Sequence, residues 1–261
     1  MKLATWNLNS LRVRLPQVID WLTVHKIDIL CLQELKLDQD KFPHDAFKEI
    51  GYHAVWAGQP TYNGVALVSK IEHEPTEVVR NIPGFEDPQQ RLITATYASS
   101  LGPLRIMSAY CPNGESLESD KFVYKMNWFT AFRQWLKKEL EHYPSLVALG
   151  DYNIAPADID VHDPERWAGK IHASDTEREM LRSILDLGLV DAFRAHHPED
   201  PGFSWWDYRR RSFPRNAGLR IDLGLVSTAL WPHCNDSWVD IEPRTNEQPS
   251  DHTPVVIELT T

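Results

Sequence analysis

Four strand-like segments occupy residues 52–110 and leave no room for helices among them. They read YHAVWAG, GVALVSK, RLITATYA and LRIMSAY, at 52–58, 64–70, 91–98 and 104–110. Parallel neighbours need a long crossover connection, usually a helix, so strands without such connections must pair antiparallel. The middle of the chain therefore predicts antiparallel sheet, and every fold proposed for this sequence has to accommodate it.

Further strands and three helices surround this stretch. Strand-like segments lie at 3–8, 27–34, 146–153, 221–227 and 253–259, and several are almost continuously apolar, as in strands covered on both faces. Helical spacing of apolar residues occurs at 10–26, 119–142 and 175–187. This mixture predicts an α/β fold in which two mixed β-sheets pack face to face with helices outside. Without repeats or a low-complexity linker, we expect one domain, 1–261.

The helices differ in how well their ends are defined. The first places Val13, Gln17, Trp21 and Leu22 near one side, but Pro16 is tolerated only near a first turn, which leaves the helix start open. The second begins at a possible cap, Ser119-Asp120, and keeps a regular apolar spacing to Leu140.

Composition restricts the cellular setting and the partners. The chain has 261 residues, no apolar run long enough for a signal peptide or a membrane span, and three cysteines without ligand-like spacing. Cys31, Cys111 and Cys234 predict free thiols in a reducing cytoplasm. The formal charge of −10 argues weakly against an acidic partner, unless the basic residues are gathered on one face.

Polar residues recur at the ends of the predicted strands. They are Asn7 and Asn9, Gln33 and Glu34, Tyr110 and Asn113, Asp151 and Asn153, Asp222, and the pair Asp251-His252. A cap or a turn explains each one separately. Together they favour metal-assisted hydrolysis of a phosphodiester, because Mg²⁺ takes oxygen ligands and no Cys/His cluster competes for zinc.

The residue types suggest separate roles. Glu34 is the best single candidate for a Mg²⁺ ligand. Asp151 can take a proton from an attacking water, and Asn153, which alternation along a strand places on the same face, can hold that water or a phosphate oxygen. His252 can donate to the charge developing at phosphorus if a carboxylate, Asp222, keeps it protonated.

These motifs, in this order, resemble those of the exonuclease III-type DNA-repair nucleases of the endonuclease/exonuclease/phosphatase superfamily. The resemblance rests on TWNLNSLRVR, LQELK, GDYNIAP, FSWWDYRRRSF, GLRIDLGLVS and PSDHTPV, and it covers nearly the whole chain. It implies a four-layered α/β-sandwich. It also implies Mg²⁺ or Mn²⁺ at Glu34 with Asn7 and Asp251 nearby, Asp151 and Asn153 at the water, His252 with Asp222 at the phosphate, and Tyr110 with Asn113 holding or polarising that phosphate.

A basic, aromatic segment counters the argument from net charge. Residues 203–220 carry Arg209, Arg210, Arg211, Arg215 and Arg220, with Asp207 as the only acid and aromatic residues interleaved. This pattern favours phosphate contacts and stacking against a nucleotide, with Trp205 or Trp206 partly in the core. A solvated loop over core aromatics is the alternative. Lys121 and Lys125 are equally consistent with phosphate contacts and with a solvated helix face.

His172 departs from the family pattern. Many relatives carry a small residue in this region, where a flipped-out abasic sugar is accommodated, and Leu219 occupies a position in the pocket wall where some relatives have tryptophan. His172 could be an ordinary surface histidine. The sharper hypothesis is that it narrows the sugar pocket and favours 3′-to-5′ exonuclease and 3′-phosphatase activity over incision at abasic sites.

The expected substrate is double-stranded DNA with abasic sites, nicks or blocked 3′ ends, bound by a monomer. A full AP endonuclease is the nearest alternative. A phosphatase of the same superfamily acting on other phosphates is disfavoured by the arginine–aromatic segment. A non-catalytic nucleic-acid-binding protein is disfavoured by the intact polar set.

Overall fold

Two mixed six-stranded sheets form the centre of the molecule in the computed structural model, which describes residues 1–260. The first sheet has the order β11-β12-β1-β2-β4-β3 and the second the order β5-β6-β7-β8-β10-β9. The strand bounds are β1 Lys2–Asn7, β2 Ile29–Gln33, β3 Tyr52–Ala57, β4 Val65–Lys70, β5 Thr76–Arg80, β6 Leu92–Ser99, β7 Gly102–Tyr110, β8 Leu146–Asp151, β9 Leu189–Asp191, β10 Asp222–Ser227, β11 Cys234–Val239 and β12 Val255–Leu259. The predicted fold class is confirmed.

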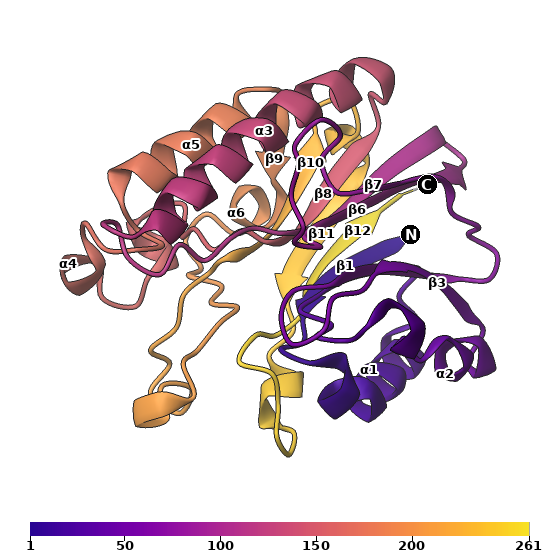
Figure 1. Cartoon of the computed structure of the whole chain (residues 1–261), viewed down its shortest axis with the longest axis horizontal. Coiled ribbons are helices and arrows are strands. Elements are labelled where there is room, and N and C mark those ends of the chain that lie inside the picture. The colour runs from indigo at the N-terminus through magenta and orange to yellow at the C-terminus, as the bar shows by residue number, and fades with distance from the viewer. Residues whose placement is uncertain (261) are drawn as a thin grey trace.

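Three apolar layers explain why the sheets stack. Side chains from the facing surfaces of both sheets form the central layer, which includes Leu3, Leu67 and Ile106. The opposite face of the second sheet packs against two helices, α3 (Asp120–His142) and α5 (Asp175–Leu185). The opposite face of the first sheet packs against α1 (Leu11–His25) and α2 (His44–Glu49). The result is a helix–sheet–sheet–helix sandwich (Figure 1). No helix among the described residues has the length and hydropathy to cross a bilayer.

The middle of the chain pairs antiparallel, as predicted, but it is divided between the sheets. β3 pairs with β4 in the first sheet, whereas β6 pairs with β7 in the second. The long connection between these two hairpins contains a strand that the sequence interpretation missed, β5, which pairs with β6. The three polar residues of TEVVR are exposed and its two valines are partly buried, so the segment lacks the longer apolar run by which the other strands were recognised.

Other short elements were also missed. They are β9, β11, α2, α4 (Pro164–Trp167) and α6 (Ala192–His196). None of these helices is longer than six residues, which is too short to display a helical period. The predicted helix 10–26 is present as α1, but Val13 was assigned to the wrong face: it is exposed, while Leu11, Val18, Trp21 and Leu22 are buried.

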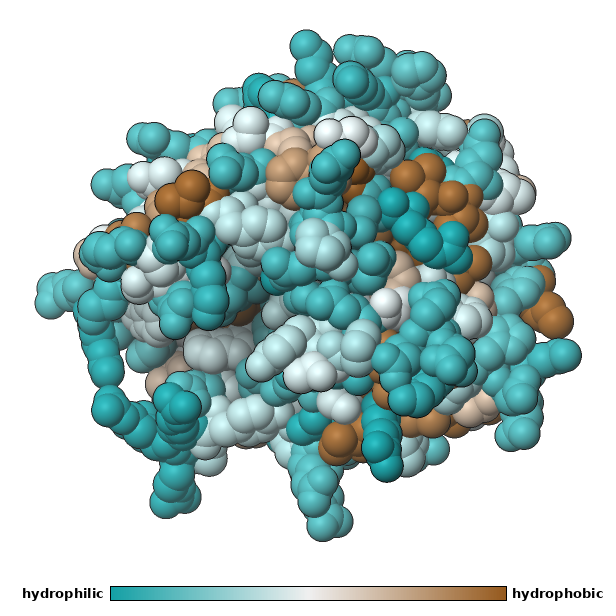
Figure 2. All heavy atoms as spheres, viewed as in Figure 1, coloured by the Kyte–Doolittle hydropathy of each residue, from teal (hydrophilic) through white to brown (hydrophobic). Residues whose placement is uncertain are grey.

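The strand directions bring the polar ends together. β1 and β2 run parallel, as do β7 and β8, so Asn7 lies beside Gln33 and Tyr110 beside Asp151. β10 runs antiparallel to β8 and begins where β8 ends, which pairs Asp222 with Asp151. Beyond this end project the loop 203–218 and the segment 240–252, the orange and yellow excursions of Figure 1. The face in Figure 2 is largely hydrophilic, with hydrophobic patches scattered across it.

Candidate active site at the end of the two sheets

Asp222, His252 and Asp151 form a buried row of hydrogen-bonding and charged groups. His252 Nδ1 lies 2.8 Å from Asp222 Oδ2, and its Nε2 lies 3.7 Å from Asp151 Oδ2. Ser204 Oγ donates to Asp222 Oδ2 at 2.7 Å and fixes that carboxylate. Burial alone would lower the pKa of His252, but the charges of Asp222 and Asp151 outweigh it and raise the pKa. The geometry therefore holds a protonated imidazolium beside Asp151.

Asp151 lies in an environment that disfavours its charge. Burial raises the pKa of Asp151 above the usual carboxyl range, the positive charge of His252 opposes this shift, and Asp222 adds to it. The backbone N–H of Asn153 donates to Asp151 Oδ1 at 2.9 Å, and Asn7 Nδ2 donates to Oδ2 at 2.9 Å. A carboxyl group with a raised pKa is suited to accept a proton.

Asn7 connects Asp151 to Glu34. The same Nδ2 group donates to Glu34 Oε1 at 3.0 Å, so the amide holds two carboxylates from different sheets at one point. Ligand atoms of Glu34, Asp151 and His252 lie within 4.8 Å of one another, the one such group found among residues 1–260. The protonated His252 cannot be a ligand, so Glu34 and Asp151 supply hard oxygen donors, which fit a divalent cation such as Mg²⁺. Lys36 contacts the other oxygen of Glu34 at 2.9 Å.

Asp251 is the predicted metal residue that lies apart from this cluster. Its Oδ1 accepts from Asn9 Nδ2 at 3.1 Å and its Oδ2 accepts from Trp205 Nε1 at 2.9 Å. Both carboxylate oxygens therefore tie loops together in this structure. Trp205 also forms isolated β-bridges with Leu219 and with His252, which places its backbone directly beside the site.

Asn153 is brought to the site by a turn and not by strand alternation. β8 ends at Asp151, and Asn153 has a left-handed backbone with φ 51°, a conformation that asparagine adopts more readily than most residues. Its Nδ2 donates to Cys111 O at 3.0 Å and to Asp151 Oδ2 at 3.2 Å. The two side chains meet as predicted, but the strand argument for their meeting was wrong.

Asn113 and His172 lie next to Asn153 on the other side from Asp151. Asn113 Nδ2 donates to Asn153 Oδ1 at 3.3 Å and lies 3.5 Å from His172 Nε2. His172 Nδ1 lies 2.8 Å from Asn153 O. Because that carbonyl can only accept, Nδ1 carries the proton, and a neutral ring accepts from Asn113 at Nε2. Burial and the charge of Lys125 lower the pKa of His172 to about 4, which favours this neutral form.

Tyr110 ends the strand next to Asp151. The guanidinium of Arg91 lies over its ring, 4.8 Å from the centroid. Loss of water contact around the hydroxyl raises the pKa of Tyr110 well above its ordinary value, and the charges of Glu34 and Asp151 add to the effect. The phenol therefore keeps its proton and can donate a hydrogen bond.

Two predicted basic contacts are corrected by burial. Lys125 was considered for phosphate contact, but its side chain is 0% exposed and forms a 2.5 Å ion pair with Glu177. Arg220 was counted with the DNA-facing arginines, but it is 0% exposed and paired with Asp160 and Asp191. Both cations are paired with buried or partly buried acids inside the protein, since a buried cation needs a charged partner.

The loop 203–218 carries four exposed arginines, and among its aromatic residues only Trp206 is buried whereas Tyr208 is 51% exposed. Arg209, Arg210, Arg211 and Arg215 are exposed, as a phosphate-contacting role requires. Trp206 is 2% exposed and packs edge-on against Phe213, with its Nε1 donating to Asn216 Oδ1. Leu219 is fully buried in a small cluster with Val161 and Ile221. Trp206 and Leu219 therefore pack beneath the exposed loop, and their side chains do not reach the surface at which substrate contact was predicted.

Several residues of the site were not found from the sequence. Lys36, Arg91 and Ser204 contact Glu34, Tyr110 and Asp222 respectively, yet none belongs to a motif that identifies it. Only QELK, with the acid and the lysine two residues apart, carried a signal for Lys36.

Comparison with known proteins agrees with this geometry. Residues 4–252 match the model of the endonuclease/exonuclease/phosphatase family. The chain belongs to this family. It is 36% identical to exodeoxyribonuclease III of Haemophilus influenzae, across 99% of the chain and all of the relative.

Two solved structures match this chain over its full length. The 3′ phosphatase NExo from Neisseria, bound to a product DNA hairpin, superposes with a TM-score of 0.96 at 50% identity, covering all of both chains. An AP endonuclease from Archaeoglobus fulgidus gives 0.94 at 37% identity, again over both full chains. The protein is thus an exodeoxyribonuclease III-like DNA-repair nuclease, a hydrolytic phosphodiesterase.

Proposed function

We propose that this family member is a Mg²⁺-dependent nuclease of double-stranded DNA that processes 3′ ends, as a 3′-to-5′ exonuclease and 3′-phosphatase. The observation that carries the proposal is the juxtaposition of Asp151 with both Glu34 and His252, through Asn7 and a 3.7 Å contact. The Glu34 carboxylate is available to a cation, the Asp151 carboxylate can accept a proton, and the His252 imidazolium can contact a phosphate. A relative at 50% identity is named as a 3′ phosphatase.

The chain's own groups divide the reaction between them. Asp151 accepts a proton from water as that water attacks phosphorus, and the Asn153 amide positions the water or a phosphate oxygen. The bond between phosphorus and the 3′ oxygen breaks, and that oxygen leaves with the upstream strand. His252, held protonated by Asp222, donates to the phosphate oxygens as their charge increases. Tyr110 and Asn113 donate from the side of the second sheet.

The metal-binding residues in this proposal are Glu34, Asn7 and, at a second position, Asp251. Mg²⁺, or Mn²⁺ in its place, supplies neutralisation of phosphate charge when bound. Asn7 serves the site even without the ion, because its amide keeps the Glu34 and Asp151 carboxylates together.

His172 sets the preference among activities. Its φ of 73° is left-handed, a strained conformation for a residue with a side chain, and its ring fills space beside Asn113 and Asn153. A ring in this position narrows the space available to a sugar on the 3′ side of the scissile phosphate. We infer that abasic sites are incised poorly while terminal phosphates and nucleotides are removed.

A full AP endonuclease of base excision repair is the second candidate. It is favoured by the similarity to the Archaeoglobus fulgidus AP endonuclease at 37% identity. In that case His172 moves aside when an abasic sugar enters. A phosphatase of non-DNA substrates has less support, because four exposed arginines of one loop lie next to the site.

The deciding experiment compares kcat/KM in Mg²⁺ on two duplexes. One carries an internal abasic site, and the other carries a nick with a 3′-phosphate. Efficient 3′-phosphate release with little incision is expected, and His172→Gly, which relieves the left-handed strain, should raise incision at least about tenfold. Asp151→Asn should abolish both reactions while DNA binding persists. Unchanged turnover in Asp151→Asn would rule out the catalytic assignment, and equal activity of the wild type on both duplexes would favour the AP endonuclease.

We further propose that residues 1–261 act as a single-domain, cytoplasmic monomer on duplex DNA with abasic sites, nicks or blocked 3′ ends. Three buried free thiols are consistent with a reducing compartment.

A further inference from the structure

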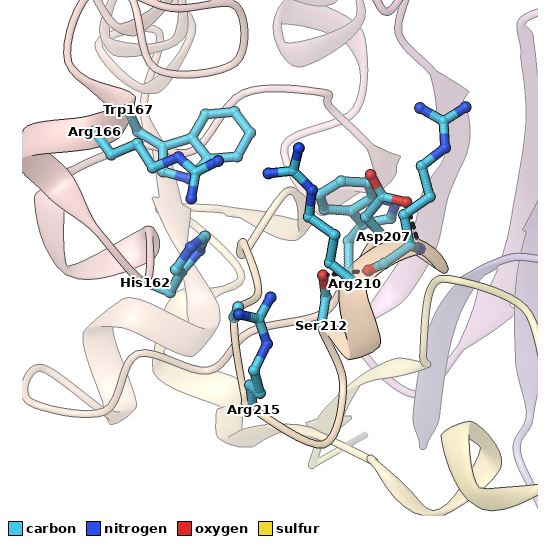
Figure 3. A pocket seen from close by; sticks show the side chains of 10 residues that line it. His162, Arg166, Trp167, Asp207, Arg210, Ser212 and Arg215 are labelled. Carbon is cyan, nitrogen blue, oxygen red and sulfur yellow. Dashed lines mark hydrogen bonds between the residues drawn. The ribbon is translucent and has the colours of Figure 1, made fainter.

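A cationic cavity of about 250 Å³ lies beside the candidate active site, between α4 and the loop 203–218. Four arginines line it, Arg166 from α4 and Arg209, Arg210 and Arg215 from the loop, against a single acid. In Figure 3 the guanidinium groups of Arg166, Arg210 and Arg215 point toward the hollow. The surface is visibly hollowed between these two regions, on the left of Figure 2. A chain with a formal charge of −10 thus concentrates positive charge here.

Local structure holds both sides of the cavity in place. On the α4 side, Asp163 caps the helix by accepting from Arg166 N at 3.1 Å, and His162 Nδ1 lies 3.2 Å from Gly218 O, which ties this side to the end of the loop. On the loop side, Arg210 and Arg211 have left-handed φ values of 57° and 51°. Two such residues in succession cost of order 1 kcal/mol each, and strain of this kind accumulates at functional sites.

The side chains that line the cavity favour the binding of an anion with several oxygen atoms. Guanidinium groups present paired N–H donors that match phosphate oxygens, and they keep their charge at every physiological pH. The one acid, Asp207, has its Oδ1 engaged by Arg209 N at 2.8 Å, and its single negative charge is outnumbered by the four arginines. Trp167 and Trp205 add flat apolar surface to the same cavity, which suits a sugar or a base next to the phosphate.

The cavity continues from the side of the active site where His172 lies. Trp205 lines it and is bridged to both His252 and Leu219, and the Trp167 ring lies 6.4 Å from the His172 ring. In the proposed function this is the side that receives whatever follows the scissile phosphate in the 3′ direction. At a recessed 3′ end nothing follows. At a nick, the next group is the 5′ end of the downstream strand.

We propose that this cavity binds the terminal 5′-phosphate of the strand downstream of a nick or short gap. The inference rests on the proposed function and specifies its substrate: a 3′-blocked nick with a downstream 5′-phosphate is preferred over the same nick with a 5′-hydroxyl. A phosphate monoester carries up to two negative charges at neutral pH, so the arginines of the lining distinguish it from an uncharged hydroxyl.

The test uses the full chain and nicked duplexes with a 3′-phosphate, differing only in a downstream 5′-phosphate or 5′-hydroxyl. Fluorescence anisotropy in EDTA gives Kd without turnover. The 5′-phosphate should lower Kd about fivefold, equivalent to one partly exposed ion pair of about 1 kcal/mol. Arg166→Ala and Arg210→Ala should each bring the ratio of the two Kd values close to one. Arg182→Ala, which removes an exposed arginine of α5 away from the cavity, should leave the ratio unchanged.

Phosphate release from a recessed 3′-phosphate duplex in Mg²⁺ is measured in parallel and reports only on the proposed function. Absence of release, with the Kd ratio intact, would overturn 3′-end processing and leave the cavity assignment standing. A wild-type Kd ratio near one, or equal loss in Arg166→Ala and Arg182→Ala, would overturn the cavity assignment. Circular dichroism confirms that each variant is folded before its ratio is interpreted.

Discussion

At the scale of single residues, His172 shows how burial changes both chemistry and stability. Burial lowers the pKa of His172 to about 4, and the positive charges of Lys125 and His252 act in the same direction, whereas the Asn153 carbonyl and Glu177 oppose the shift. The folded protein therefore resists protonation that the unfolded chain accepts near pH 6.5.

This difference predicts a loss of stability in mild acid. Between pH 6.5 and pH 4 the unfolded state binds the extra proton, so the free energy of unfolding falls as pH falls, by up to about 3 kcal/mol from this residue. Chemical denaturation at pH 7 and pH 5 measures the change. His172→Gln should lose less stability than the wild type over this interval, whereas His44→Gln, at a surface histidine of α2, should behave like the wild type. Equal losses in all three proteins would contradict the prediction.

At the scale of elements, one buried ion pair connects α3, α5 and three loops of the site. Lys125 Nζ donates to Glu177 Oε1, to Asn113 O at 3.1 Å and to Asn153 O at 2.8 Å. Glu177 in turn accepts from the backbone N–H of His172 at 3.0 Å and caps its own helix through Ser174. The pair thus fixes the backbone of the residues that face the substrate.

Breaking the Lys125–Glu177 ion pair should lower both the free energy of unfolding and kcat/KM, and only the first should partly recover in a double variant. Lys125→Met leaves a buried, unpaired carboxylate and should lower the free energy of unfolding by about 3–5 kcal/mol. Adding Glu177→Gln removes that charge but keeps an acceptor for His172 N, so part of the stability should return. Because Asn113 and Asn153 still lack their donor, kcat/KM should remain low in the double variant. Lys137→Met, at an exposed lysine of the same helix, is the control. Full recovery of kcat/KM in the double variant would limit the pair to a stabilising role.

Elements with strong periodicity were predictable from the sequence, and those defined by partners were not. α3 was recognised because buried residues such as Phe129, Phe132 and Leu136 recur at helical spacing. β5 was not recognised, since TEVVR forms a strand only through pairing with β6. Likewise, the residues at the strand ends were found from their type, but the burial of Lys125 and Arg220 depends on acids distant in sequence, Glu177 and Asp160, that no local pattern reveals.

At the scale of the whole molecule, charge is segregated along the direction of the strands. β8 runs from Leu146 at one end to Asp151 at the other. The surface near its beginning is acidic, with Glu72, Glu74 and Glu77 lining a groove there. The loop beyond its end carries Arg209, Arg210, Arg211 and Arg215. A field of this kind orients an approaching duplex toward the active site even though the net charge is −10.

This segregation predicts a salt dependence that only the exposed arginines control. The logarithm of the association constant for duplex DNA should fall linearly with the logarithm of salt concentration, with a slope of about 0.9 per phosphate neutralised. Arg209→Ala, which lies between the cationic cavity and the groove beside Asn113, should reduce the magnitude of that slope by about 1. Arg220→Lys, in the same segment but buried against Asp160 and Asp191, should lower stability and leave the slope unchanged. Anisotropy titrations in EDTA between 50 and 200 mM salt, roughly the range over which such contacts are resolved, give both slopes. If Arg209→Ala left the slope unchanged, or Arg220→Lys altered it equally, the duplex would have to be held by charges outside this loop.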